Sequence, residues 1–257
     1  VGFGGYIAFP AGLMGVLLGK PLVLHEQNSV AGLVNKVLAG VADRVFTAFP
    51  DVLKNAKWVG NPLRPAFMQQ PEPAARFAGR SGPLKLLVVG GSLGAQALNR
   101  IVPQALALIP EAHRPHVLHQ SGARKIEELR ENYRAAGVVA ELTPFIYDTA
   151  SAFAEADLIV CRAGASTVTE IAAIGAAALF VPFPAAVDDH QTSNAAFLVQ
   201  KGASWLMSQA DLTAANLAAM LQKTERPALL ERALMAKTMQ KIDATAEVVA
   251  ACEELAS

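Results

Sequence analysis

The stretch LIVCRAGASTVTE, residues 158–170, predicts an α/β fold. Its apolar start, residues 158–161, is typical of a buried strand, and small residues then form a turn before a helix with Glu170 in its first turn. A strand, a glycine turn and a helix in succession often build a nucleotide site, because unpaired amides at the helix start attract anionic oxygens. In this setting Glu170 can accept hydrogen bonds from sugar hydroxyls, and Arg162 adds positive charge at the end of the strand.

A second turn of the same kind lies upstream. The apolar run LKLLVV, residues 84–89, ends in GGSLGA, residues 90–95, and a helical pattern follows. The spacing differs from the G-x-G-x-x-G dinucleotide fingerprint, and no acidic residue lies at the matching place downstream. Gly90, Gly91 and Gly94 still allow the backbone to approach a phosphate closely. Ser92 can cap the helix or donate its hydroxyl to that phosphate.

The composition excludes several classes of protein. With 257 residues, 53% of them hydrophobic and 17% charged, the chain can bury a large core as one or two domains. Zero formal net charge and the lack of a basic cluster argue against a nucleic-acid partner. Cys161 and Cys252 lack the spacing of a metal site, and so few cysteines fit a reducing compartment rather than a disulfide framework.

The beginning of the chain predicts that an N-terminal portion is missing. The sequence starts with Val1 and opens directly into a glycine-rich loop, residues 2–5, which needs an element before it. No signal peptide is recognisable, and the apolar stretch at residues 9–18 is shorter than the roughly 20 residues that span a bilayer. We expect this stretch to be core, with a fraction that touches a membrane surface.

Strands and helices alternate along the chain, which predicts parallel sheets. We expect strands at residues 21–24, 44–49, 84–89, 117–120, 138–142, 158–162, 178–182 and 204–207. We expect helices at residues 10–19, 31–42, 95–109, 125–136, 149–156, 167–174 and 188–201. Residues 62–83 contain five prolines among small and polar residues, which is typical of an interdomain linker, with a short helix near residues 74–77.

Seven segments together resemble glycosyltransferase family 28, and within it the bacterial enzymes that add N-acetylglucosamine to a lipid-linked muramyl pentapeptide. They occur in the family's order over nearly the whole chain, and their combination is specific although no single one is. The segments are GFGGY at 2–6, HEQN at 25–28, VGNP at 59–62 with Arg64, GGSLGA at 90–95, HQSG at 119–122, CRAGA at 161–165 through Glu170, and DDHQ at 188–191 with Asn194.

The resemblance implies a GT-B fold, in which two Rossmann-like parallel-sheet domains face a cleft, with the first domain incomplete here. Residues 1–63 would be the remainder of the N-terminal domain, on the acceptor and membrane side, and a closing helix at about 241–257 would pack back on it. Residues 64–83 would be the linker and hinge. Residues 84–240 would form the C-terminal domain that binds the UDP-sugar.

The resemblance also assigns residues to the phosphates and the ribose of the sugar donor. Arg64 would reach the diphosphate, with a solvated linker charge as the alternative. Ser92 would contact the diphosphate and also cap its helix. Glu170 would hold the ribose hydroxyls, unless Thr167 and Glu170 merely form a capping box. The whole donor-binding turn would be Ala165, Ser166, Thr167, Val168, Thr169 and Glu170.

Other residues are assigned to the uracil, the sugar and the bound substrate. Ile146 would meet the uracil through its backbone, although an isoleucine after Pro-Phe is usually core. Gln191 would hold the sugar hydroxyls, because an amide both donates and accepts; a plain helix-start residue is the alternative. Asn194 is a weaker neighbour in the same string, and Asn28 would contact the bound substrate.

A sugar transfer needs a base that removes the proton of the acceptor hydroxyl, and His25 is the candidate in this chain, with Glu26 beside it. His25 follows a strand end and has a suitable intrinsic pKa, but it could also be a structural histidine bonded to the backbone. A histidine of the family's N-terminal part is an equal candidate. No metal and no other cofactor are expected, because a helix start already explains the acidic residues 188 and 189.

The expected reaction is an inverting transfer of N-acetylglucosamine from UDP-GlcNAc to the C4 hydroxyl of lipid-linked N-acetylmuramyl-pentapeptide. It would convert lipid I to lipid II in peptidoglycan synthesis, with roles in cell shape and division. The expected partners are UDP-GlcNAc, the undecaprenyl-linked acceptor and proteins of cell-wall synthesis or division. The expected location is peripheral, on the cytoplasmic face of the bacterial plasma membrane. The alternatives are transfer to another lipid or small acceptor, and a fragment that binds UDP-GlcNAc without turnover.

Overall fold

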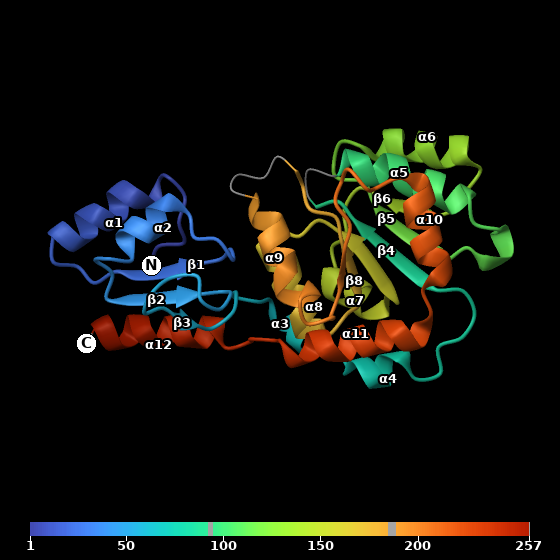
Figure 1. Ribbon diagram of the computed structural model, residues 1–257. Helices are drawn as coiled ribbons and strands as arrows, with labels where there is room; N and C mark the ends of the chain where they lie inside the picture. The colour runs from blue at the N-terminus through green and yellow to red at the C-terminus, as the bar shows by residue number, and fades with distance from the viewer. Residues whose placement is uncertain (92–94, 185–188, 257) are drawn as a thin grey trace.

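The chain forms two lobes, each built on a parallel sheet, in the computed structural model shown in Figure 1. The structure describes residues 1–91, 95–184 and 189–256. The smaller lobe holds β1 (Val23–Glu26), β2 (Arg44–Thr47) and β3 (Lys57–Trp58), hydrogen-bonded in that order. The first and last parts of the chain therefore share one lobe, because the closing helix α12 (Ala244–Ala256) packs on this sheet.

Alternation along β1 explains the two layers of the smaller lobe. Leu24 points to the side covered by α1 (Ala8–Leu17) and α2 (Leu33–Leu38). Val23 points to the opposite side, where it is buried against Val248 of α12. A strand whose successive side chains are both buried needs a helix on each face, and residues from the two ends of the chain provide them.

The larger lobe is built on six parallel strands within the described residues. Their order is β6 (Glu141–Thr143), β5 (His116–Gln120), β4 (Lys85–Val89), β7 (Leu158–Cys161), β8 (Ala178–Phe180) and β9 (Trp205–Leu206). The strand order reverses between β4 and β7, which lie side by side at the centre. In open α/β sheets such a switch point leaves a crevice at the carboxyl ends of the strands, where ligands bind.

Helices cover both faces of the larger sheet, so its central strands β4, β7 and β8 are mostly apolar. One face packs against α5 (Gln96–Ala107), α6 (Ile126–Ala136) and α10 (Ala214–Lys223), as Figure 1 shows. The other face packs against α7 (Thr149–Glu155), α8 (Ala165–Ile174) and α9 (His190–Val199), with α11 (Arg226–Thr238) alongside. A short 3₁₀ helix, Glu111–His113, precedes β5.

Several predicted elements are longer in the sequence pattern than in the structure. The helix expected at 31–42 spans only Leu33–Leu38, and the strand expected at 138–142 lies at Glu141–Thr143. Strand ends are misplaced because apolar burial continues past the last residue of the strand: Phe49 and Val181 are buried although they follow β2 and β8. Hydrophobicity marks what is buried, and it does not mark where the ladder ends.

The proline-rich segment is not a free linker. It forms α3 (Pro65–Met68) and α4 (Pro73–Phe77), and Phe67 is fully buried in the core of the larger lobe. The Arg76 guanidinium donates to the carbonyl oxygens of Ala154, Ile174 and Gly175. The expectation that residues 64–83 act as the hinge is therefore wrong, because these residues are anchored to the larger lobe.

The two chain connections between the lobes instead meet at Gly60 and Lys241. Gly60 has a φ of +87°, and a Cβ added there would lie 2.6 Å from both the Cβ and the carbonyl oxygen of Lys241. The next residue, Asn61, donates to Gln27 O in the smaller lobe and to Thr169 Oγ1 in the larger one. The contact between the lobes is thus close and polar, and it needs a glycine.

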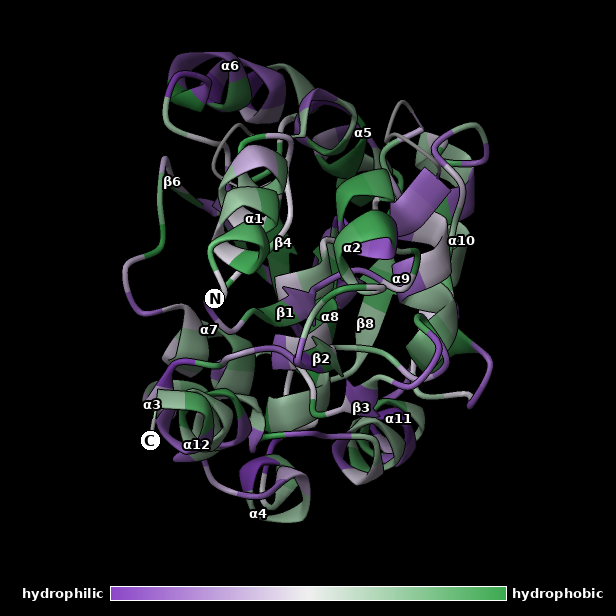
Figure 2. Ribbon diagram, turned by 90° about the vertical axis from the view of Figure 1, so that its left-hand side faces the viewer, coloured by the Kyte–Doolittle hydropathy of each residue, from purple (hydrophilic) through white to green (hydrophobic). Residues whose placement is uncertain are grey.

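An apolar face of the smaller lobe is exposed. Large hydrophobic side chains of α1, α2 and the adjoining turns point away from the core, and Figure 2 shows hydrophobic residues on both helices. They are Tyr6, Ile7, Leu13, Met14, Leu17, Leu18, Leu33, Val37 and Val41. The expectation that residues 9–18 are mainly core is wrong, since no residue of α1 is buried. In the described ranges no helix is long and apolar enough to cross a bilayer.

Replacement of Gly60 by alanine should destabilise the chain strongly. We expect a loss of about 1–2 kcal/mol from the left-handed backbone and a further ~1–3 kcal/mol from the overlap with Lys241. Gly202→Ala is the matched control, because Gly202 has a φ of +69° with nothing within 4 Å of an added Cβ. Differential scanning calorimetry checks this; equal melting temperatures for the two variants would contradict the close contact at Gly60.

Candidate functional site

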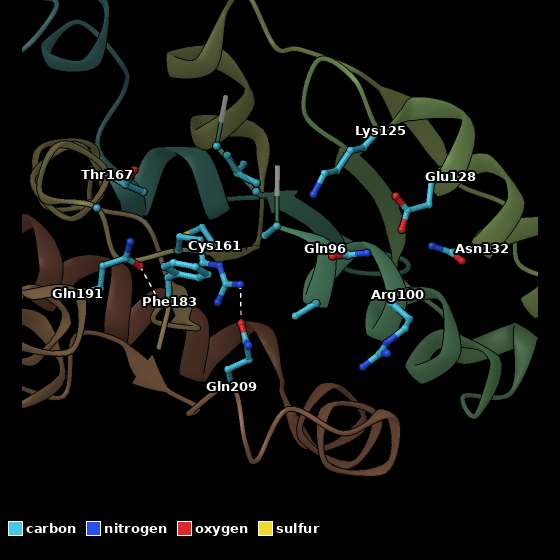
Figure 3. Close-up of a pocket in the computed structure, with 17 residues that line it drawn as sticks. Gln96, Arg100, Lys125, Glu128, Asn132, Cys161, Thr167, Phe183, Gln191 and Gln209 are labelled. Carbon is cyan, nitrogen blue, oxygen red and sulfur yellow. Dashed lines mark hydrogen bonds between the residues drawn. The ribbon is translucent and has the colours of Figure 1, made fainter. Parts of the chain in front are cut away.

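A cavity of about 840 Å³ opens at the carboxyl ends of β4 and β7. Figure 3 shows side chains from several elements converging on it. Five predicted site residues line it: Gly90, Gly91, Arg162, Thr167 and Gln191. The remaining lining residues are Val89, Ala95, Gln96, Ala97, Arg100, Lys125, Glu128, Asn132, Cys161, Gly164, Phe183 and Gln209. The two turns singled out by the sequence therefore meet at one cavity.

Two helices begin at this cavity, and among residues 1–91, 95–184 and 189–256 no side chain caps either of them. The N-cap residue of α5 is Ala95 and that of α8 is Gly164, and neither provides a capping hydrogen bond. The alternative in which Thr167 and Glu170 form a capping box is wrong, because Thr167 lies inside the helix that starts at Ala165. First-turn amides left without side-chain acceptors can bind an anionic group of a ligand.

Glu170 lies in the second turn of α8, not in the first turn as expected, where it faces Arg64, and neither residue lines the cavity. Arg64 Nη2 lies 3.7 Å from Glu170 Oε1 and also donates to Thr149 Oγ1. Burial raises the pKa of Glu170 to about 7, and the Arg64 guanidinium opposes that shift. Arg64 is therefore held against the larger lobe, beside a carboxyl group with a raised pKa, and is not a free linker charge.

Arg162 braces the wall of the cavity. Its guanidinium donates to the carbonyl oxygens of Val181 and Pro182 at 2.9 and 3.0 Å, and to Gln209 Oε1 at 2.7 Å. Burial lowers its pKa from the ordinary value. Arg162 thus brings positive charge to the cavity, while its hydrogen bonds hold the loop after β8.

Gln191 presents one half of its amide to the cavity. Its Oε1 accepts from the Phe183 amide at 2.9 Å, the bond dashed in Figure 3, so the Nε2 group is the half that remains for a ligand. Among the other residues of the predicted donor-binding turn, Thr167 lines the cavity and Ser166 is exposed. Ala165 is half-buried at the first position of α8.

Three predicted contacts are directed elsewhere through their side chains. Val168 is fully buried in the core under α8. Thr169 Oγ1 donates back to Ala165 O and Ser166 O and accepts from Asn61, so it faces the other lobe. Ile146 packs against the core and does not line the cavity. A ligand could reach these three residues only through their backbone.

Asn194 joins the two lobes. Its Oδ1 accepts from the amide and the hydroxyl of Ser29, both at 2.8 Å, and its Nδ2 donates to Asn28 Oδ1 and to Ala163 O. Asn194 is 1% exposed, so its hydrogen-bonding groups are occupied by protein. The expectation that Asn194 contacts a sugar is therefore not supported by this geometry, and Asn28 is drawn into the same contact between the lobes.

His25 and Glu26 are structural in this geometry. His25 is fully buried, its Nε2 donates to Gly60 O at 2.8 Å, and its Nδ1 accepts from Gln27. Burial lowers the pKa of His25 below its ordinary value, and the Gly60 carbonyl and Glu26 only partly oppose this shift. Glu26 accepts from the amides of Asn28 and Gly32 and from Asn35. His25 has no access to a substrate hydroxyl, which favours the structural alternative over the candidate base.

Some predictions fall outside the described residues, and some lining residues were not predicted. Ser92 and Gly94 lie in the range 92–94, which the structure does not describe. Within the described ranges, no cluster of His, Cys, Asp and Glu could hold a metal ion. The unpredicted polar residues are Gln96 and Arg100 of α5, Lys125 at the N-cap of α6, Glu128 and Asn132 of α6, and Gln209 after β9. They resemble ordinary surface residues in sequence, and the packing of α6 against α5 brings those of the two helices to the cavity.

Comparison with known proteins decides the family. Residues 85–249 match the C-terminal domain of glycosyltransferase family 28, and residues 1–47 match the N-terminal domain of the same family. The chain belongs to glycosyltransferase family 28. The resemblance seen in the sequence is therefore confirmed, and the cavity lies in the part of the chain that matches the family's C-terminal domain.

Relatives of this family share most of the sequence. The chain is 78% identical over its full length to a protein of Polaromonas sp. strain JS666 and covers 66% of that protein. It is 74% identical to a protein of Paracidovorax citrulli and covers 72% of it. Both relatives are named UDP-N-acetylglucosamine–N-acetylmuramyl-(pentapeptide) pyrophosphoryl-undecaprenol N-acetylglucosamine transferase. The chain thus spans about two thirds of the length of these relatives.

Solved structures agree with the fold. The crystal structure of Acinetobacter baumannii MurG is 41% identical in sequence and superposes with a TM-score of 0.89, with 98% of this chain and 72% of that one covered. The calicheamicin glycosyltransferase CalG4, at 16% identity and a TM-score of 0.61, shares the fold alone. The prediction of a GT-B fold of two parallel-sheet lobes is confirmed.

Replacement of Glu170 by glutamine should stabilise the chain in a pH-dependent way. The folded-state pKa of about 7 exceeds the unfolded value of about 4.3, so stability from this carboxyl is complete below about pH 4 and is lost as the pH rises towards 7. We expect Glu170→Gln to gain about 1–3 kcal/mol near pH 8 and clearly less near pH 5.

Urea unfolding at both pH values measures this difference. Glu127→Gln is the control, since the Glu127 side chain is 78% exposed and forms only a surface pair with Arg130. An equal gain for Glu170→Gln at the two pH values would show that the carboxyl group is not perturbed.

Proposed function

We propose that this chain is the sugar-donor part of an inverting transferase that moves N-acetylglucosamine from UDP-GlcNAc to the C4 hydroxyl of lipid-linked N-acetylmuramyl-pentapeptide. The reaction would convert lipid I to lipid II in peptidoglycan synthesis and so contribute to cell shape and division. The observation that carries this proposal is the meeting of two helix starts at one cavity, neither of them capped by a side chain of the described residues, in a chain at least 74% identical to two transferases of that name.

The leaving UDP group gathers negative charge on its diphosphate as the bond to the sugar breaks. The first-turn amides of α5 and α8 would meet that charge together with Arg64, which lies 3.7 Å from Glu170 in the second turn of α8. These donors are fixed before the reaction begins, so little reorganisation is needed in the transition state. This arrangement can stabilise the leaving group without a metal ion.

Glu170 and Gln191 would orient the nucleoside and the sugar. A carboxylate is an acceptor only, which suits the two hydroxyls of a ribose, and the exposed half of the Gln191 amide is a donor. Arg64 pairs with Glu170 in the structure and would shift towards the diphosphate when UDP-GlcNAc binds. When Arg64 moves away, Glu170 loses the interactions that favour its ionised form. The carboxylate then stays ionised only if hydrogen bonds from the ribose hydroxyls replace those interactions.

The acceptor hydroxyl needs a base, which typically contributes about 10²–10⁴ in rate. His25 is buried with both ring nitrogens engaged, so we place the base in a part of the relatives that this chain does not cover. The exposed apolar face on α1 and α2 supports a peripheral location at the cytoplasmic side of the membrane, where a lipid-linked acceptor is available.

A second candidate function is binding of UDP-GlcNAc without turnover. The donor lobe has its own core and its own cavity, so it can bind the nucleotide sugar independently of the acceptor side.

Sugar transfer to a short-chain analogue of lipid I, followed by mass spectrometry of the product, tests the proposed reaction. We expect lipid II formation with UDP-GlcNAc by the chain joined to the N-terminal segment of a close relative. Transfer only to a different acceptor would overturn the choice of substrate. UDP-GlcNAc binding by the 257-residue chain without any product would favour the second candidate.

Isothermal titration calorimetry of the variants tests the site. Glu170→Ala and Gln191→Ala should each weaken UDP-GlcNAc binding by about tenfold or more, because each loses hydrogen bonds to the ligand. Gln191→Ala should weaken UDP-GlcNAc but leave UDP binding almost unchanged, since its amide would contact the sugar. Glu127→Ala, on the exposed side of α6, is the control. Unchanged binding by both site variants would place the nucleotide sugar elsewhere.

A further inference from the structure

The tetrapeptide His119–Gly122 is buried next to the candidate site, yet it does not line the cavity. It forms the end of β5 and the turn that follows. His119 and Ser121 are fully buried and Gln120 is 4% exposed. Three polar side chains in succession at the carboxyl end of a buried strand need hydrogen-bond partners, and those partners indicate what the tetrapeptide does.

His119 fixes the end of β5 to two helices. Its Nδ1 lies 3.0 Å from the Tyr133 hydroxyl of α6, and its Nε2 lies 3.2 Å from Asn99 Oδ1 of α5. Asn99 Nδ2 donates to Ser121 O, so its Oδ1 must accept, which assigns the ring proton to Nε2. Burial lowers the pKa of His119 to about 3, so the ring is neutral and suits this arrangement.

Gln120 reaches from this fixed strand end to the glycine turn after β4. It pairs in register with Val89, the last residue of β4, and its Nε2 donates to Gly91 O at 3.2 Å. Gly91 has a φ of +81°, a conformation that side-chain-bearing residues rarely adopt, and it lines the cavity. The side-chain amide of Gln120 therefore holds the backbone of Gly91 in place.

The other half of the Gln120 amide is not paired by any group of residues 1–91, 95–184 and 189–256. Its Oε1 is buried and has no hydrogen-bond partner in the described part of the chain. A buried acceptor without a partner destabilises the folded state, and an apolar side chain of similar length would fill the space without that cost. The amide is therefore best explained by the bond that it donates to Gly91.

We infer that Gln120 is a positioning residue for the diphosphate of the sugar donor. It acts through Gly91, whose backbone it holds at the cavity, and it does not itself touch the donor. This inference rests on the proposed function only in so far as the cavity binds a nucleoside diphosphate. Removal of the donated bond should release the turn and weaken binding of the phosphates, while the nucleoside keeps its own contacts.

Titration of the 257-residue chain with UDP by calorimetry and with uridine by NMR tests the inference. We expect Gln120→Met to weaken UDP binding by about tenfold and to change uridine binding by less than about twofold. Gln120→Glu should weaken UDP binding further, because an ionised carboxylate cannot donate to Gly91 O and repels phosphate. It also keeps the test usable if the methionine variant does not fold.

Ser204→Ala is the matched control. Ser204 is as buried as Gln120, also carries an oxygen without a partner, and precedes β9 at the far edge of the same sheet. It should leave the ratio of the UDP and uridine dissociation constants unchanged. Circular dichroism melting of each variant confirms that the fold is kept.

The outcomes separate the inference from the proposed function. Equal weakening of UDP and uridine by both Gln120 variants would assign Gln120 a purely structural role and overturn the inference. Unchanged UDP binding by both variants would overturn it as well. Failure of the unaltered chain to bind UDP would instead overturn the proposed use of the cavity, and the inference would fall with it.

Discussion

The adjacency of β4 and β7 at the centre of the larger sheet is the constraint on which the site depends. Because both strands are parallel and pair in register up to Val89 and Cys161, their following turns open at the same edge. Each turn leads into a helix whose first amides have no side-chain cap in the described part of the chain. Two partial positive charges are thereby placed at one cavity, which no single turn could achieve.

The lobes are joined by a small set of buried polar contacts. Asn61 and Asn194 each hydrogen-bond to both lobes, and His25 holds the Gly60 carbonyl where the two connections meet. Residues of the HEQN segment (25–28) and the VGNP segment (59–62) thus form part of the contact between the lobes. A base or ligand role for His25 and Asn194 would require these hydrogen bonds to break first, which is costly for buried groups.

Charge and burial act together around α8. Glu170 is buried enough for its carboxyl to titrate near neutrality, and Arg64 arrives from the segment that joins the lobes. Since that segment is anchored on the larger lobe by Phe67 and Arg76, Arg64 moves with the donor side and not as a free tether. The two chain connections between the lobes lie against each other at Gly60 and Lys241.

The sequence by itself determined the α/β class, the two glycine turns and the family, because apolar periodicity and small-residue turns are local properties of the chain. It also identified Gly90, Gly91, Arg162, Thr167 and Gln191, which line the cavity. Only the tertiary structure decided the roles of His25, Asn194 and the proline-rich segment, and only it linked Gln120 to Gly91. Those roles depend on which groups distant in sequence become hydrogen-bond partners, and residue type and spacing do not encode that pairing.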